Sequence, residues 1–325
     1  MNRVTVIMIT YSHEAYIQKA IEGVLTQNCD FDFELLISND CSPDKTDEIV
    51  KEIISTSTKS HLINYYNHSL NLGMIKNFNW ALGKANSKYI AICDGDDYWI
   101  DPMKLQKQVS FLESNPNYGL IHTQYGRSYF PYNSFEISRI NRSDNSFNSL
   151  IANNPIITST VCFRQDLYKD YVLEIEPADK DWVACDTPIW LWFAKKSNIY
   201  FLDNLTTVNH IIPGSASNTN SSKQYLNFIK SRLSIREYFI KNYGGNPNQV
   251  SFIYNDFYVD GEYHILKLRE FKLIESYLEH LRRNRRVIKY IYISNFYRFY
   301  KFEFLYKFLF IFYRIFHRIN NSSKY

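Results

Sequence analysis

The sequence lacks the features that mark several protein classes. Its five cysteines form no CxxC pair, and their odd number and irregular spacing fit neither a zinc site nor a disulfide framework. No run of about 18 apolar residues occurs, so no standard transmembrane helix is predicted. The first residues become polar too early to hold the apolar region of a signal peptide. We therefore expect reduced thiols and a cytoplasmic location.

The charge balance excludes a further class of protein. A formal net charge of +4 is too small to indicate nucleic-acid binding by the whole chain, and no nucleic-acid-binding motif occurs. Hydrophobic residues make up 45% of the chain, which is enough for a sizeable core. The length of 325 residues suggests one large domain with an appendage, or two small domains.

The first hundred residues alternate between strand-like and helix-like patterns. Apolar, β-branched runs typical of strands lie at residues 4–11, 33–40, 61–69 and 88–95. Segments with apolar residues at helical spacing lie between them, at 14–27, 42–55 and 74–85. This order predicts an α/β fold with a mostly parallel sheet flanked by helices. Ligands of such sheets bind beyond the carboxyl ends of the strands.

The later elements are less regular. Helices are predicted at residues 101–116 and 186–197, a strand at 199–204, a mobile loop at 213–224, and helical structure from about residue 223 onward. Asp101 is the predicted N-cap of the first of these helices, and Pro102 suits its first position.

Three carboxylates, Asp94, Asp96 and Asp97, follow the fourth predicted strand in "YIAICDGDDYW". Carboxylates repel one another and are costly to bury unpaired. A calcium loop is excluded, because the required glycine and glutamate are missing at its sixth and twelfth positions. An aspartate-nucleophile phosphatase is disfavoured, because its acidic pair usually follows the first strand and precedes a small hydroxyl residue.

Two explanations of this cluster stay open. The carboxylates could form a solvated loop before the next helix, or they could bind a divalent metal that bridges a nucleotide diphosphate. Mg²⁺ and Mn²⁺ prefer one or two carboxylates together with phosphate oxygens and water. Such a metal would neutralise the charge that develops as a sugar–phosphate bond breaks.

Five ordered segments resemble glycosyltransferase family 2, whose fold is called GT-A. They are "VTVIMITYSHEAYIQKAIEGVLTQ", "FELLISNDCSPDKTDEIV", "NLGMIKNFNWALGKA", "AICDGDDYW" and "DTPIWLWFA". The resemblance covers roughly residues 1–217, and both the GxGxxG fingerprint and the Walker A pattern are absent. It implies a Rossmann-like, mostly parallel sheet and the transfer of a sugar with inversion of its anomeric configuration.

The resemblance implies nucleotide-binding roles for a set of residues near the strand ends. They are Thr10, Tyr11, Glu14, Asp40, Asn71, Gly73, Lys76 and Asp94. Asp40 would accept a hydrogen bond from the N3–H of uracil or thymine, although a turn at the strand end would explain the same residue. Gly73 could equally be a turn glycine. Lys76 takes the approximate place of a family arginine, which keeps the charge but loses the bidentate fork.

The same resemblance identifies Asp94 and Asp96 as the DxD motif. Asp96 would be the direct ligand of Mn²⁺ or Mg²⁺, and Asp94 would hold the ribose or a metal-bound water. Asp97 has no assigned role, and His210 could approach the diphosphate.

The acceptor side is expected around residue 186. Inversion in one step requires a base opposite the leaving diphosphate, and Asp186 stands where the family places it. Asp179 and Asp181 are the local alternatives, and Asp186 could also be a helix N-cap, which does not exclude catalysis. Acceptor contacts are expected from Thr158, Thr160 and Trp190.

The expected organisation is a donor-binding half at residues 1–100, an acceptor-binding and catalytic half at 101–217, and a helical region at 218–325. The tail interleaves Arg and Lys with aromatic residues, which fits either an anionic membrane surface or an ordinary helical pair packed on the domain. We expect a transferase that moves a sugar from a UDP-sugar to a saccharide or polyprenyl-linked saccharide in bacterial surface polysaccharide synthesis, at the inner face of the membrane. An inactive saccharide- or nucleotide-sugar-binding relative, and a nucleotidyltransferase, are the alternatives.

Overall fold

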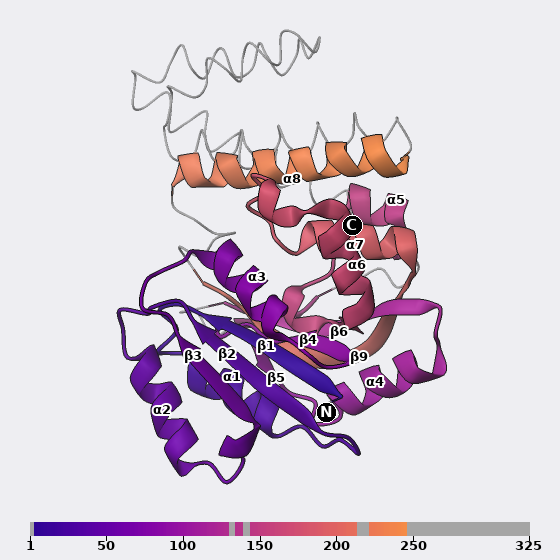
Figure 1. Cartoon of the computed structure of the whole chain (residues 1–325). Helices are drawn as coiled ribbons and strands as arrows, with labels where there is room; N and C mark the ends of the chain where they lie inside the picture. Colours follow the sequence, from indigo (N-terminus) through magenta and orange to yellow (C-terminus); the bar gives the residue numbers. More distant parts are fainter. Residues whose placement is uncertain (1–2, 130–133, 139–143, 213–220, 246–325) are drawn as a thin grey trace, which may run out of the picture. The chain divides into compact units, whose positions relative to one another are not determined.

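The computed structural model describes residues 3–129, 134–138, 144–212 and 221–245 (Figure 1). The chain divides into two compact units. The first contains residues 1–219 and 227–254, and the second contains residues 220–226 and 255–325. Every contact discussed below lies within the first unit. The basic aromatic tail lies outside the described residues.

The first unit is built on a sheet whose strands run in the order β3-β2-β1-β4-β8-β6-β9-β5, with β7 paired to β6. Their bounds are β1 Val4–Thr10, β2 Phe33–Asn39, β3 Ile63–Asn67, β4 Tyr89–Ile92, β5 Tyr98–Trp99, β6 Tyr118–Tyr129, β7 Ser134–Ile137, β8 Cys162–Arg164 and β9 Asn198–Ile211. The pairs among β1 to β4 are parallel, which confirms the expected first half of the sheet. β8 is antiparallel to both β4 and β6, so β6 runs in the direction of β4.

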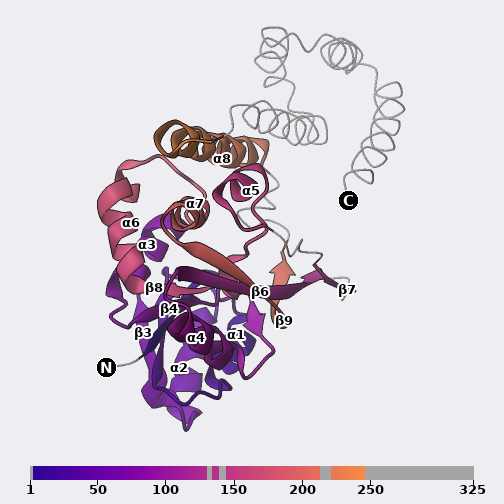
Figure 2. The same cartoon turned by 90° about the vertical axis from the view of Figure 1, so that its right-hand side faces the viewer.

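Helices cover both faces of this sheet (Figure 2). The α-helices are α1 Ile17–Leu25, α2 Thr46–Thr56, α3 Met74–Lys84, α4 Lys104–Ser114, α5 Phe147–Ala152, α6 Gln165–Ile175, α7 Thr187–Lys196 and α8 Ser222–Tyr243. Short 3₁₀ turns occur at η1 Ser60–Leu62, η2 Thr158–Thr160 and η3 Pro177–Asp179.

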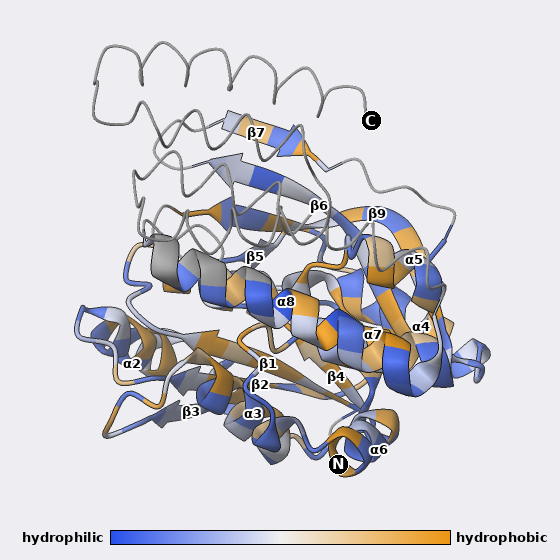
Figure 3. Ribbon diagram, turned by 90° about the horizontal axis from the view of Figure 1, so that it is seen from above, coloured by the Kyte–Doolittle hydropathy of each residue, from blue (hydrophilic) through white to orange (hydrophobic). Residues whose placement is uncertain are grey.

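Two hydrophobic cores result, one on each face of the sheet. Apolar side chains of α1, α2 and α4 pack on one face, and those of α3, α5, α6 and α7 pack on the other. Ile235 and Phe239 of α8 are fully buried in the second core. Figure 3 shows that β1 and β2 are hydrophobic along most of their length, as expected for strands covered on both faces.

The structure differs from the sequence-based expectations mainly after residue 100. The strand expected at residues 199–204 extends over 198–211, because it pairs with the long strand β6 along most of its length. Helix α4 begins at Lys104 with Met103 as its N-cap, and the Asp101 carboxylate instead accepts the Met103 N–H in the preceding turn. Within the described residues, no helix is long and apolar enough to cross a membrane.

Candidate active site

The acidic loop begins where β4 ends, beside the end of β1. Cys93 and Gly95 donate backbone hydrogen bonds to Ile7 and Ile9, so the loop continues the pairing of β4 with β1. A Cβ atom on Gly95 would lie 2.8 Å from the Thr10 Oγ1 and 2.9 Å from the His13 Nδ1. Glycine at this position therefore lets the DxD motif approach the β1 end closely.

Asp96 lies opposite a histidine. The His13 Nε2 is 3.9 Å from the Asp96 Oδ2, while the His13 Nδ1 is hydrogen-bonded to the Thr10 Oγ1 at 3.1 Å. Burial lowers the pKa of His13, and the negative charge of Asp96 opposes this shift. The Asp96 side chain is 23% exposed, so a ligand can reach its carboxylate.

Asp94 is held by η2. The Ser159 hydroxyl accepts the Asp94 backbone N–H at 3.1 Å and donates to the Asp94 Oδ2 at 3.4 Å. The Ser159 carbonyl in turn accepts the Trp99 Nε1–H at 2.8 Å. Burial, together with the charges of Asp96 and Asp186, raises the pKa of Asp94 to about 8.

Asp97 connects the acidic loop to β9. Its carboxylate accepts hydrogen bonds from the Asn209 side chain at 3.0 Å and from the His210 backbone N–H at 3.0 Å. Asp97 is only 2% exposed, and burial, with the charges of Asp96 and Asp94, raises its pKa. Asp97, which had no expected role, is therefore a buried residue that attaches the acidic loop to β9.

His210 lies on the rim of the acidic loop. Its Nδ1 is 2.5 Å from the Asp96 carbonyl oxygen, which can only accept, so Nδ1 carries the proton of this bond. The imidazole lies between the rings of Tyr16 and Tyr98, at centroid distances of 5.1 and 5.3 Å. The approach of His210 to a diphosphate stays a prediction, and among the described residues no hydrogen bond to its Nε2 atom occurs.

Asp40 organises the loop that precedes α3. It is 2% exposed, and its two carboxylate oxygens accept the backbone N–H groups of Leu72 at 2.7 Å and Gly73 at 2.9 Å. The Asn71 side chain donates to the Asp40 carbonyl at 3.1 Å. Gly73 has a φ of +84°, which supports its interpretation as a turn glycine. Recognition of a base by Asp40 stays a prediction.

The other expected nucleotide-binding residues occupy different environments. Thr10 is buried beside the acidic loop, whereas Tyr11 is 46% exposed. The Glu14 Oε2 accepts the Lys45 backbone N–H at 3.0 Å, which ties the β1 loop to the start of α2. Lys76 is exposed on α3.

Asp186 is the N-cap of α7. Its Oδ1 accepts the Thr187 N–H at 2.7 Å and the Thr187 hydroxyl at 3.3 Å, while no bond to its Oδ2 occurs among the described residues. Burial raises the pKa of Asp186. The negative charge of Asp186 is one of the causes that raise the pKa of Asp94, so the two carboxylates interact electrostatically. Asp181 is exposed, and Asp179 lies in η3.

Two of the expected acceptor contacts are in the core instead. Trp190 is fully buried and packs edge-on against Phe163 at 5.9 Å, and Thr160 is also fully buried, with its hydroxyl donated to the Ile157 carbonyl. Both side chains point into the core, so neither has an exposed surface that an acceptor could contact. Thr158 is half-buried.

Sequence reasoning missed His13, Ser159 and Asn209. His13 lies in the segment "TYSHEAY", and Ser159 lies between Thr158 and Thr160, which were expected to contact the acceptor. Their ordinary residue types gave no signal on their own. Only the closure of the sheet brings them to the acidic loop.

The strand order, the helices on both faces of the sheet and the acidic loop after β4 agree with the α/β arrangement called GT-A. Residues 5–172, slightly more than half of the chain, match the family model described as "Glycosyl transferase family 2". The chain belongs to that family.

Curated relatives match only part of the chain. An uncharacterized protein of Mycobacterium tuberculosis is 33% identical over 184 residues, which cover 54% of this chain and 51% of the relative. The putative teichuronic acid biosynthesis glycosyltransferase TuaG of Bacillus subtilis is 32% identical over 109 residues, covering 34% and 41%. The chain thus spans about half the length of the first relatives that it matches.

Solved structures share the fold at low sequence identity. Residues 1–349 of TarS from S. aureus, in complex with UDP-GlcNAc, align with a TM-score of 0.58 at 18% identity, covering 91% of both chains. The mannosyltransferase PcManGT from Pyrobaculum calidifontis, in complex with GDP-Man and Mn²⁺, aligns with a TM-score of 0.55 at 14% identity, covering 95% of this chain and 86% of that one.

Proposed function

We propose that the protein is a metal-dependent, inverting glycosyltransferase that moves a hexosyl or N-acetylhexosaminyl unit from a UDP-sugar to a saccharide or lipid-linked saccharide. The observation that carries this proposal is the acidic loop beyond the end of β4, where the negative charge of Asp186 helps to raise the pKa of Asp94. A family 2 glycosyltransferase needs a diphosphate site and a base at this edge of the sheet. The Asp94 and Asp186 carboxylates lie close enough for their charges to interact.

The carboxylates fit a divalent cation that arrives with the donor. Within the described part of the chain, no three His, Cys, Asp or Glu side chains are grouped to hold a metal alone. Mn²⁺ and Mg²⁺ accept a few carboxylates and take their remaining ligands from phosphates and water. Asp96 would hold the ion, with Asp94 beside it. When bound, the ion would stabilise the departing diphosphate.

The remaining residues would bind the donor and move the proton. The Asp186 Oδ2 would take the proton of the acceptor hydroxyl, since Oδ1 is used by Thr187. Its raised pKa makes Asp186 a stronger base than an exposed aspartate. The His210 Nε2 would face the diphosphate. TarS in complex with UDP-GlcNAc and PcManGT in complex with GDP-Man support a nucleotide-sugar donor, and we propose uracil as its base.

The cellular role is proposed from the relatives and the tail. The name of TuaG refers to teichuronic acid biosynthesis, which supports a role in bacterial surface polysaccharide synthesis. The basic aromatic tail would hold the enzyme at the inner face of the membrane.

Calorimetric titration of the full-length protein with UDP, with and without Mn²⁺, tests the donor site. We expect Mn²⁺-dependent binding that is lost in Asp96→Ala and kept in Asp181→Ala, since Asp181 is an exposed carboxylate. Binding of dTDP or GDP instead of UDP would show that the donor carries a nucleobase other than uracil. Failure of all three nucleotides would contradict the transferase proposal.

A further inference from the structure

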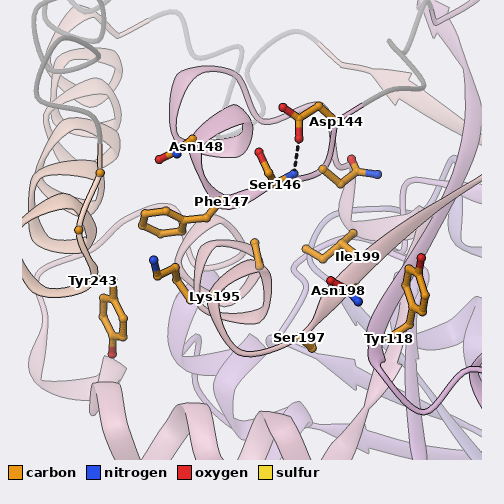
Figure 4. Close-up of a pocket in the computed structure, with 14 residues that line it drawn as sticks. Tyr118, Asp144, Ser146, Phe147, Asn148, Lys195, Ser197, Asn198, Ile199 and Tyr243 are labelled. Atoms are coloured by element: carbon orange, nitrogen blue, oxygen red, sulfur yellow. Dashed lines mark hydrogen bonds between the residues drawn. The ribbon is translucent and has the colours of Figure 1, made fainter.

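A pocket of about 870 Å³ has none of the acidic-loop residues in its lining. Figure 4 shows the side chains that line it. Its walls come from the first residues of β6 and β9, the segment 144–148, the end of α7 and residues 243–245. Since β6 runs in the direction of β4, the amino ends of β6 and β9 lie at the sheet edge opposite the DxD motif. The volume is typical of ligand sites, which measure about 300–1,000 Å³. The proposed reaction does not use this pocket.

The lining is rich in amides and aromatic rings. Asn145, Asn148 and Asn198 contribute amide groups, and the Asn145 Oδ1 is hydrogen-bonded to the His122 Nε2 at 3.1 Å. Tyr118 and Tyr243 contribute rings, and one face of the Tyr243 ring stacks on Phe239. Amide groups both donate and accept hydrogen bonds, and aromatic rings present flat apolar faces. A saccharide needs this combination, because its ring edges carry hydroxyl groups and its ring faces carry C–H groups.

The charges of the lining disfavour a phosphate ligand. Lys195 and Asp144 contribute one charge of each sign, so the pocket has no excess of positive charge. The Lys195 ammonium lies 4.6 Å from the centroid of the Phe147 ring, and the Asp144 Oδ1 accepts the Ser146 N–H at 2.8 Å. Figure 4 shows Phe147 and Lys195 on the same side of the pocket. Neutral or weakly charged sugars fit this balance better than a nucleoside diphosphate does.

Helix α7 joins this pocket to the proposed base. Asp186 caps its first turn, and Ala194 and Lys195 at its other end line the pocket. Ten residues make a helix about 15 Å long. The residues between the two ends, including Trp190 and Phe193, are fully buried, so α7 is firmly packed.

We propose that this pocket is a second saccharide-binding site, which binds an oligosaccharide outside the catalytic centre. Saccharide binding here is independent of the proposed transferase reaction. The identity of the bound glycan, either a remote part of the acceptor or a separate effector, rests on the proposed function.

Saturation-transfer NMR on the full-length protein tests binding, with the neutral sugars maltotriose and chitotriose as probes. We expect at least one to bind, and about tenfold weaker binding in Asn198→Ala and Lys195→Met, from the loss of one hydrogen bond or charge contact. Binding should be unchanged in Asp96→Ala, which removes the donor site, and in Asn86→Ala, a matched exposed asparagine. No binding of any probe, unchanged binding in both pocket variants, or loss of binding in Asp96→Ala would overturn the proposal.

Transfer assays with short and long acceptors distinguish the two glycan sources. If the pocket holds a remote part of the acceptor, Asn198→Ala raises KM for the long acceptor alone. If it holds an effector, the bound trisaccharide changes kcat for the short acceptor in the wild type and not in Asn198→Ala. A pocket that binds a trisaccharide in an otherwise inactive protein would refute the transferase proposal and leave this inference standing.

Discussion

The carboxylate cluster should destabilise the metal-free protein, and Asp94→Asn should relieve this cost. The pKa of Asp94 is raised from 3.8 to about 8, so the folded state binds a proton more tightly than the unfolded state does. Stability is therefore lost as the pH rises from about 4 to about 8. At about 1.4 kcal/mol per pH unit, the cost reaches about 1.6 kcal/mol at pH 5 and about 4 kcal/mol at pH 7. These are upper bounds, because neighbouring carboxylates share the cost.

Urea unfolding in the presence of EDTA, at pH 5 and pH 7, measures this effect. The amide of Asp94→Asn can still bond to the Ser159 hydroxyl, so the substitution removes the charge with little change of shape. We expect a gain of about 1 kcal/mol at pH 5 and about 2–4 kcal/mol at pH 7. Asp181→Asn, at an exposed carboxylate, should stay within about 0.5 kcal/mol of the wild type. A gain that does not grow with pH would refute the reasoning.

Three further predictions concern the proposed base, the loop before α3 and the packing of α1 against β5. Asp186→Asn should lower kcat by about 10²–10⁴-fold in steady-state assays while the UDP affinity stays unchanged; normal turnover would exclude Asp186 as the base. Asp40→Asn should cost about 1–3 kcal/mol in urea unfolding without nucleotide, because its carboxylate accepts two backbone N–H groups; an unchanged midpoint would show that the loop does not depend on it. Gly23→Ala should lower the free energy of unfolding by about 1–3 kcal/mol, because the new Cβ would lie 2.8 Å from the Trp99 carbonyl oxygen. Gly83 has open space for a Cβ, so Gly83→Ala is the control, and equal stability of the two variants would contradict the close approach at Gly23.

The strands and helices of the first hundred residues were predicted well from the sequence, because local patterns determine them. The apolar runs that form β1, β2 and β4 are covered on both faces, so burial and strand propensity agree. The acidic residues after β4 lie close together in sequence, and the resemblance to the family predicted a DxD motif there. The N-cap position of Asp186 was also predictable, from the threonine and proline that follow it.

The second half was less predictable, because it depends on pairing between distant segments. Strand β9 extends to Ile211 only because β6 lies alongside it, and the polar residues near its end carry no strand pattern of their own. The residue types of Trp190 and Thr160 suit acceptor contacts, but the orientation of α7 and η2 decides what these side chains contact. The contact of Ser159 with Asp94 likewise depends on the orientation of η2 and cannot be read from the residue type.

The attachment of Asp97 to β9 has a consequence for the order in which the chain folds. Its hydrogen-bond partners Asn209 and His210 follow it by 112 and 113 residues, and β5 pairs with β9 across a similar separation. During synthesis the first four strands can pair while β9 is still unmade, since contacts near in sequence form before distant ones. The nascent chain therefore holds an acidic loop without its anchor until residue 210 leaves the ribosome. Completion of the acidic loop is therefore a late event in folding, although its three carboxylates are made early.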